Sequence, residues 1–324
     1  MNRLFRWNQT GLFLLALAAG ILPFAVPEVC AAALREGLTL CSGPLLLSLF
    51  PFLVVSRLLV QCPESDLLAL PFRLAAWGIG IRTPCAARVL CIGFLGGFAP
   101  AASAAAQAVR TGQLTAEEAD ALLPACICSG PSFVVLTVGQ SLLGSAELGV
   151  LLFASQITAN YLTAALLNRF AGVRSVKPGS AAQASPAPPR LDEILADAAI
   201  TYCKLCGFIL FFRMLAAGAG ALLPAGAGTL CAILLEVCSG CDLASRTGRW
   251  GSLLCCAALS VQGLSVLLQV RTICPPEMTL RPLYRARMLH LPLSLALFYL
   301  LLPGGEADVF STLPARVFLM RRVP

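Results

Sequence analysis

The chain has 324 residues, of which 58% are hydrophobic and only 12% are charged, and its mean hydropathy is +0.84. Soluble domains are roughly 45–50% apolar and about 25% charged, so this composition excludes an ordinary soluble protein and indicates a polytopic membrane protein. The formal net charge is +7. The basic residues lie between apolar runs and do not cluster with aromatic residues, which favours a membrane topology signal over nucleic-acid binding.

Apolar runs predict an all-α fold with about seven transmembrane helices, each needing roughly 20 residues to cross about 30 Å of hydrocarbon. The first run follows Arg3 and Arg6 and could be read as a cleaved signal peptide. Because it continues to about residue 33 and further spans follow, we interpret it as a retained helix. The predicted spans are residues 11–33, 37–60, 121–143, 146–168, 199–222, 250–272 and 286–302.

Residues 88–110, RVLCIGFLGGFAPAASAAAQAVR, carry glycines and a proline near the middle and an arginine at each end. If Arg3 and Arg6 are cytoplasmic, two crossings return the chain to the cytoplasm before this segment. A re-entrant hairpin then leaves Arg110 cytoplasmic, whereas a spanning helix would place it outside. The positive-inside rule therefore favours the hairpin.

Residues 171–190 are rich in Ala, Ser and Pro and predict a flexible cytoplasmic linker. On either side of it the order of segments is alike: a span, a short segment containing glycine (88–110 and 234–245), a helix with a Gly-Ser break, and another helix. This pattern is typical of inverted-repeat transporters. The predicted divisions are an N-terminal transmembrane helix at 1–36, a first repeat at 37–170, the linker at 171–190, a second repeat at 191–302 and a tail at 303–324.

The orientation of the two halves follows from the arginines. The span at 37–60 runs inward, whereas the span at 199–222 leaves the cytoplasmic linker and runs outward, so the halves are expected to be inverted. Arg287 and the arginines at 281 and 285 are then cytoplasmic, which supports the inversion. The basic residues of the tail are then external, which counts against it.

The two Gly-Ser breaks, SGPS at 129–132 and QGLS at 262–265, fall inside long apolar runs. Backbone that is not helical has N–H and C=O groups that lipid cannot satisfy. The breaks either permit close helix packing or face a wet pocket into which helix ends point. Because the breaks and hairpins form two matching pairs, we favour the pocket. The predicted substrate-binding residues are Gly97, Ser129, Gly130, Ser132, Glu236, Ser239, Gly240, Gln262, Gly263, Ser265 and Gln269.

Glu236 is a carboxylate in an apolar run, where an ionised group is costly. It is either a functional group or the partner of Arg213 or Lys204, and the sequence favours neither reading. A further local signal is TAEEA, in which Thr115 and Glu118 have the spacing of a helix capping box.

Catalytic and metal motifs are weak in this sequence. Two Cys-x-x-Cys pairs, at 203–206 and 238–241, have metal-ligand spacing, but both lie in predicted membrane segments and His290 is the only histidine. The chain has no recognisable hydrolase, metalloprotease or phosphate-loop motif. We therefore expect no enzyme activity, no metal and no cofactor.

The blocks GFLGGFAPAAS (93–103), CSGPSFVVLTVG (128–139), LLEVCSG (234–240) and QGLSVLLQV (262–270) resemble the sporulation integral membrane proteins of the YlbJ type. These belong to the group that carries the nucleoside-recognition, or Gate, domain. The similarity covers roughly residues 35–300. It implies a multi-pass protein of a bacterial cell membrane, a role in spore formation, and movement of a nucleoside-like or other small polar solute.

Two classes of function follow. The first is a transporter or permease for a small polar solute. The second is a non-transporting membrane component that organises assembly of the spore cortex or envelope. The chain has little soluble sequence for docking beyond the linker, which favours the first class. The expected partners are the lipid bilayer and the solute, with other sporulation membrane proteins and further copies of the chain as additional candidates and no nucleic acid.

Overall fold

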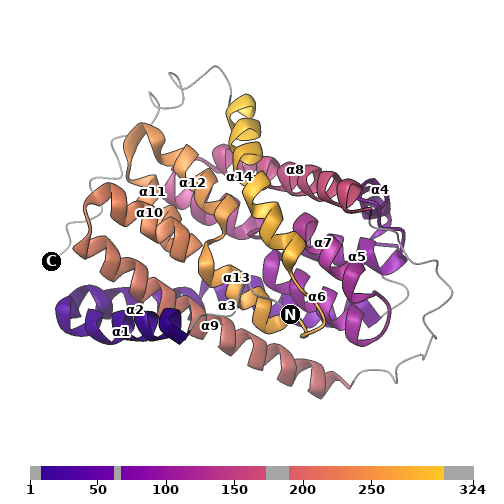
Figure 1. Cartoon of the computed structure of the whole chain (residues 1–324), viewed down its shortest axis with the longest axis horizontal. Coiled ribbons are helices and arrows are strands. Elements are labelled where there is room, and N and C mark those ends of the chain that lie inside the picture. Colours follow the sequence, from indigo (N-terminus) through magenta and orange to yellow (C-terminus); the bar gives the residue numbers. More distant parts are fainter. Residues whose placement is uncertain (1–8, 62–66, 173–189, 303–324) are drawn as a thin grey trace.

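The computed structural model describes residues 9–61, 67–172 and 190–302, and every regular element in these ranges is a helix (Figure 1). Four helical stretches are long and apolar enough to cross a membrane: Pro27–Leu47, Ala146–Ala171, Leu191–Leu222 and Gly248–Ile273. The predicted all-α fold is confirmed, and the four apolar stretches support a membrane protein. Within the described residues, fewer stretches than the expected seven meet this criterion.

The first two predicted spans have the wrong boundaries. The structure places α1 at Gln9–Ala25, α2 at Pro27–Ser42 and α3 at Pro44–Gln61. α2 and α3 each begin at a proline, which has no N–H to donate and disfavours helical geometry in the residue before it. The breaks therefore fall at Val26 and Gly43, and not near residue 35.

The middle of the described chain contains a pair of helices, α5 and α6, joined by a single residue. It also contains a helix interrupted between α7 and η2. α4 is Leu70–Gly78, and α5, Pro84–Gly96, is joined through Gly97 to α6, Phe98–Arg110. α7, Ala116–Cys126, is separated from the π-helix η2, Ser132–Leu142, and α8 is Ala146–Ala171. The predicted capping box is confirmed, since Thr115 and Glu118 each bond the other's backbone N–H at the start of α7. The predicted break in the 121–143 run is also present.

Apart from α4 and a short turn, the order of elements from α3 to α8 recurs after residue 190. The long helix α9, Leu191–Leu222, is followed by α10, Ala225–Leu235, and α11, Val237–Ser245, which are joined through Glu236. After the 3-10 turn η3, Gly248–Trp250, come α12, Gly251–Val261, and α13, Gly263–Ile273, separated at Gln262, and then α14, Arg281–Leu301. Most of the predicted linker and the whole predicted tail lie outside the described residues.

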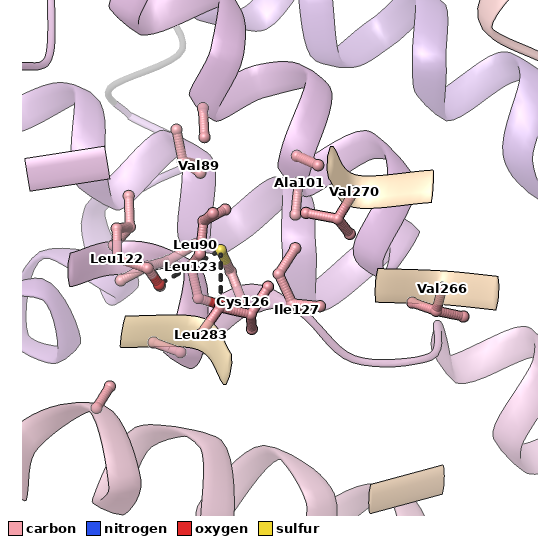
Figure 2. Close-up of a cluster of buried hydrophobic side chains, with 14 of the residues drawn as sticks. Val89, Leu90, Ala101, Leu122, Leu123, Cys126, Ile127, Val266, Val270 and Leu283 are labelled. Atoms are coloured by element: carbon pink, nitrogen blue, oxygen red, sulfur yellow. Dashed lines mark hydrogen bonds between the residues drawn. The ribbon is translucent and has the colours of Figure 1, made fainter. Parts of the chain in front are cut away.

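The helices pack into one layered bundle. In Figure 1, α9 runs along one edge beside α2 and α3, while α8 lies toward the opposite edge and is crossed by α14. Figure 2 shows part of the main core, where side chains of α5, α6, α7, α13 and α14 meet. α6 contributes alanines that are fully buried, which lets neighbouring helices approach closely.

The outer surface is strongly apolar. Phe24, Phe170, Leu47, Met288 and Leu300 each leave more than three quarters of their surface exposed. In water this exposure would be unfavourable, whereas against lipid acyl chains it costs nothing. The surface and the four long apolar helices together support a membrane environment.

Candidate functional site

Two helix breaks, one at 127–131 between α7 and η2 and one at Gln262 between α12 and α13, each contact the tip of a helix pair. The tip is the residue that joins the pair: Gly97 between α5 and α6, and Glu236 between α10 and α11. Gly97, at the tip between α5 and α6, has φ +80°, and a Cβ built there would lie 2.6 Å from the backbone nitrogen of Gly130. Gly263, which starts α13, has φ +67°, and its Cβ would lie 2.9 Å from the backbone nitrogen of Glu236. The first tip therefore packs on the first break, and the second tip packs on the second break.

These contacts surround a central cavity at the meeting point of the two halves. It leaves about 50 Å³ for the centres of water-sized molecules, which is several times the roughly 10–15 Å³ that one water needs. α3 and α9 close it with aliphatic side chains. Its lining consists of Leu45, Leu49, Gly96, Phe98, Ser129, Gly130, Ser132, Phe133, Ile209, Glu236, Val237, Cys238, Val266 and Gln269.

Three helices begin at the wall of the central cavity. Their first residues, Phe98 of α6, Ser132 of η2 and Val237 of α11, all line it. The first turn of a helix has N–H groups without helical partners and carries a partial positive charge. No side chain caps α6 or η2. The cavity is therefore rich in hydrogen-bond donors from the backbone.

Glu236 supplies the carboxylate of the central cavity and caps α11. Its oxygens accept hydrogen bonds from the backbone N–H of Cys238 at 2.8 Å and of Ser239 at 2.7 Å, and from the Ser239 hydroxyl at 2.9 Å. The side chain is 1% exposed. Glu236 forms no ion pair with Arg213 within the described ranges, and Arg213 instead bonds Glu36 at 2.7 Å. Three N–H and O–H donors provide the stabilisation that a buried carboxylate requires.

The other Glu236 alternative, a pair with Lys204, is also wrong. Lys204 lies in α9 and lines a second cavity, which does not include Glu236. It forms no ion pair with any residue of the described ranges.

Gln269 provides an acceptor that has no partner in the described part of the chain. Its Nε2 donates to the Ser265 hydroxyl at 2.8 Å, while its buried Oε1 is left without a hydrogen bond. The residue is 1% exposed and lines the central cavity. A buried carbonyl oxygen without a partner costs roughly 1–3 kcal/mol, so a donor group of a bound solute would be favoured there.

The predicted binding residues separate into two groups. Ser129, Gly130, Ser132, Glu236 and Gln269 line the central cavity, and Gly97 joins two lining residues, Gly96 and Phe98. The expectation that the remainder would also line it is not met. They form a supporting layer made up of Ser239, Gly240, Gln262, Gly263 and Ser265.

Packing explains why the supporting residues lie behind the cavity. A Cβ on Gly240 would come within 2.8 Å of the Ile233 Cα, so this glycine lets α11 approach α10 closely. Gln262 turns the chain with φ +66° and donates to the Leu259 carbonyl at 2.9 Å. Its second contact, to the Ser129 hydroxyl at 3.4 Å, links the two breaks.

Sequence reasoning missed the function of Arg287. We expected this residue to be a cytoplasmic topology signal, but it is buried between the two broken helices. Its guanidinium donates to the carbonyl of Ile127, the C-cap of α7, at 2.5 Å, and to the carbonyl of Ser260, in the last turn of α12, at 3.3 Å. One cation thus caps the C-terminal ends of both helices. The available signal was its place on one helical face with His290 and Ser294, both of which are also buried.

Comparisons with models of protein families, with curated proteins and with solved structures found no match. Within the described ranges, no three His, Cys, Asp or Glu side chains are grouped so that they could hold a metal ion. What the central cavity offers is hydrogen bonding: two hydroxyls, an amide oxygen, a carboxylate and helix N-termini, set against aliphatic and aromatic walls.

Proposed function

We propose that this chain is a multi-pass protein of a bacterial cell membrane that binds a small polar solute in the central cavity and moves it across the bilayer. One observation carries the proposal: the first helix break and both pair tips, far apart in sequence, line a single cavity, and the second break packs against the second tip behind its wall. Interrupted backbone at membrane depth is tolerated where it lines such a cavity, and transporters use it to bind substrates.

The proposed topology has about seven crossing segments, with α5–α6 and α10–α11 as re-entrant pairs in an inverted repeat. Two features support it. Apart from α4 and the short turn η3, the order of elements from α3 to α8 matches that from α9 to α14. In addition, the contact between Gly97 and Gly130 is matched by the contact between Glu236 and Gly263, at corresponding places in the two halves. A repeat of contacts is stronger support than a repeat of hydropathy alone.

The lining favours a neutral solute that has both donors and acceptors. The Gln269 Oε1 would receive a hydroxyl or amide N–H, while the hydroxyls of Ser129 and Ser132 can donate or accept. Phe98 and Phe133 provide aromatic surface for a flat ring. A nucleoside-like molecule has this combination of groups. Because the present volume is small, its entry requires the walls to move apart, as alternating access demands.

The resemblance to the YlbJ-type proteins extends the proposal to spore formation. In that setting the solute would be taken up or released during maturation of the spore. Other sporulation membrane proteins and further copies of this chain belong to the same proposal as partners. The alternative is a non-transporting organiser of cortex or envelope assembly, which would use the same residues for packing alone.

The first test is a thermal-shift screen of the detergent-purified chain against nucleosides, amino acids, dicarboxylates and peptidoglycan precursors. We expect one class to stabilise the wild-type protein saturably. Gln269→Leu removes the free acceptor and should abolish the shift, and Glu236→Gln should weaken it. Gln140→Leu is the matched control, because Gln140 is exposed on η2 and does not line the cavity. No shift in a folded sample, or an equal shift in Gln269→Leu, would refute solute binding at this site.

A further inference from the structure

A second cavity lies at one end of the bundle, where α3, α6, α9 and α13 meet. It leaves about 160 Å³ for the centres of water-sized molecules, about three times the volume of the central cavity. Its wall contains charged and hydroxyl side chains, in contrast to the largely apolar central cavity. The polar residues of the lining are Arg57, Ser103, Arg110, Asp197, Thr201, Lys204 and Thr272.

The charge of this second cavity is strongly positive. Arg57, Arg110 and Lys204 contribute three positive charges, and Asp197 contributes the only negative charge in the lining. Arg57 forms an ion pair with Asp197, whose side chain is 61% exposed. The cavity therefore keeps two positive charges that no carboxylate in its wall balances.

The bonding capacity of these cations is not used up. Arg57 is 8% exposed and its Nε has no hydrogen-bond partner in the described ranges. Arg110 makes one long contact, 3.4 Å, to the Ile273 carbonyl. Lys204 has no hydrogen bond or ion pair with any described residue, and both Lys204 and Arg110 are exposed, so of the three cations only Arg57 is buried with an unpaired nitrogen. A buried guanidinium nitrogen without a partner is costly, so the site favours a ligand that accepts hydrogen bonds.

Helix capping accounts for only part of this arrangement. Arg57 and Arg110 lie near the C-terminal ends of α3 and α6, where cations are favourable on their own. Lys204 lies in the first half of α9, away from any C-terminus of its own helix, yet it faces the same cavity. Helix capping therefore does not explain the position of Lys204, and it does not explain why a cavity lies between Arg57, Arg110 and Lys204.

We propose that the second cavity is a binding site for a phosphate group. Arginine presents planar pairs of N–H donors that match phosphate oxygens, and lysine adds a point charge. The hydroxyls of Ser103 and Thr201 supply further donors. In a membrane protein the phosphate comes either from an anionic lipid headgroup or from a soluble phosphorylated molecule, and basic pockets between helices bind the former.

The test is calorimetric titration of the detergent-purified full-length chain with three probes: short-chain phosphatidylglycerol, short-chain phosphatidylcholine and inorganic phosphate. We expect saturable binding of phosphatidylglycerol, whose headgroup is anionic, and none of phosphatidylcholine, whose phosphate is neutralised by its own quaternary ammonium group. Arg110→Gln and Lys204→Gln should each weaken binding about tenfold, which is about 1.4 kcal/mol. Arg285→Gln is the matched control, because Arg285 is exposed and does not line the cavity. Arg57 is left intact because it is buried.

Competition identifies the source of the phosphate. If inorganic phosphate does not displace phosphatidylglycerol, the site takes a lipid headgroup. Displacement, with matching loss of phosphate binding in Lys204→Gln, assigns a soluble phosphate ligand. The proposal is overturned if neither phosphatidylglycerol nor inorganic phosphate binds the wild-type chain. It is also overturned if both bind the double variant Arg110→Gln/Lys204→Gln as tightly as they bind the wild type. Thermal unfolding of each variant confirms that it is folded, and the readout does not depend on solute binding in the central cavity.

Discussion

At the residue scale, Gly97 and Gly263 hold the two contacts on which the central cavity depends. Gly97→Ala should lower the stability of the chain, because φ +80° is a region that glycine alone adopts easily and the new Cβ would lie 2.6 Å from backbone. Such strain costs about 1–3 kcal/mol. Gly263→Ala should act in the same direction, since its Cβ would lie 2.9 Å from backbone atoms of Leu235 and Glu236.

The measurement is the thermal unfolding midpoint in one detergent. Gly207→Ala is the control: this glycine is inside α9 and a Cβ there would meet nothing within 4 Å. Alanine is up to about 1 kcal/mol better than glycine inside a helix, so the control should be neutral or stabilising. Midpoints that fall equally in all three variants would show that the contacts at Gly97 and Gly263 are not special.

The sequence was informative about some site residues and silent about others. Ser129, Ser132 and Gln269 were selected as polar residues at or near a break in an apolar run, but the same signal also selected Gln262 and Ser265, which lie behind the cavity. The hydrogen bonds of Glu236 were not predictable from the sequence. Glu236 accepts from the Ser239 N–H because the chain turns at residue 236, where α11 begins. Whether Gln262 lines the cavity or lies behind it depends on a backbone φ that composition does not encode.

At the element scale, Arg287 stabilises two helix ends at once. Arg287→Met should destabilise the chain, because it leaves the Ile127 and Ser260 carbonyls without their charged donor. An unpaired buried acceptor costs about 1–3 kcal/mol, offset in part by relief from burying the charge. Arg287→Lys should lose less, since a lysine keeps the charge. Thermal unfolding measures both.

Arg285→Gln is the control for this prediction. It lies two residues away on α14, is exposed, and is not the donor to the Ile127 and Ser260 carbonyls. Its unfolding midpoint should match that of the wild type. A midpoint of Arg287→Met at the wild-type value would mean that water or backbone adjustment satisfies the two carbonyls, and that the shared cap is unimportant.

Helix breaks were predicted well where glycine and serine interrupt an apolar run, and poorly where proline starts a new helix. The interruptions at 127–131 and at Gln262 match the sequence analysis. The divisions at Val26 and Gly43 were missed because hydropathy stays high across both prolines. A window average over apolar residues does not register a backbone hydrogen bond that proline cannot make.

At the scale of the whole molecule, the inverted repeat predicts that the two ends of the bundle face opposite sides of the membrane. Gly112 follows α6 and Thr247 follows α11, and both are exposed. Cysteines placed there singly, in a background depleted of other cysteines, should react with an impermeant maleimide from opposite sides of intact cells. Labelling of both positions from the same side would rule out the inverted arrangement.

The central claim is that the protein binds a solute in the central cavity and moves it across the membrane. The most direct measurement is uptake, by proteoliposomes, of the compound that stabilises the purified chain. We predict saturable uptake by the wild type and by Gln140→Leu, and at least about a tenfold loss in Gln269→Leu, which corresponds to roughly 1.4 kcal/mol. Uptake no faster than in protein-free liposomes, by a chain that still binds the compound, would contradict transport and favour the non-transporting organiser.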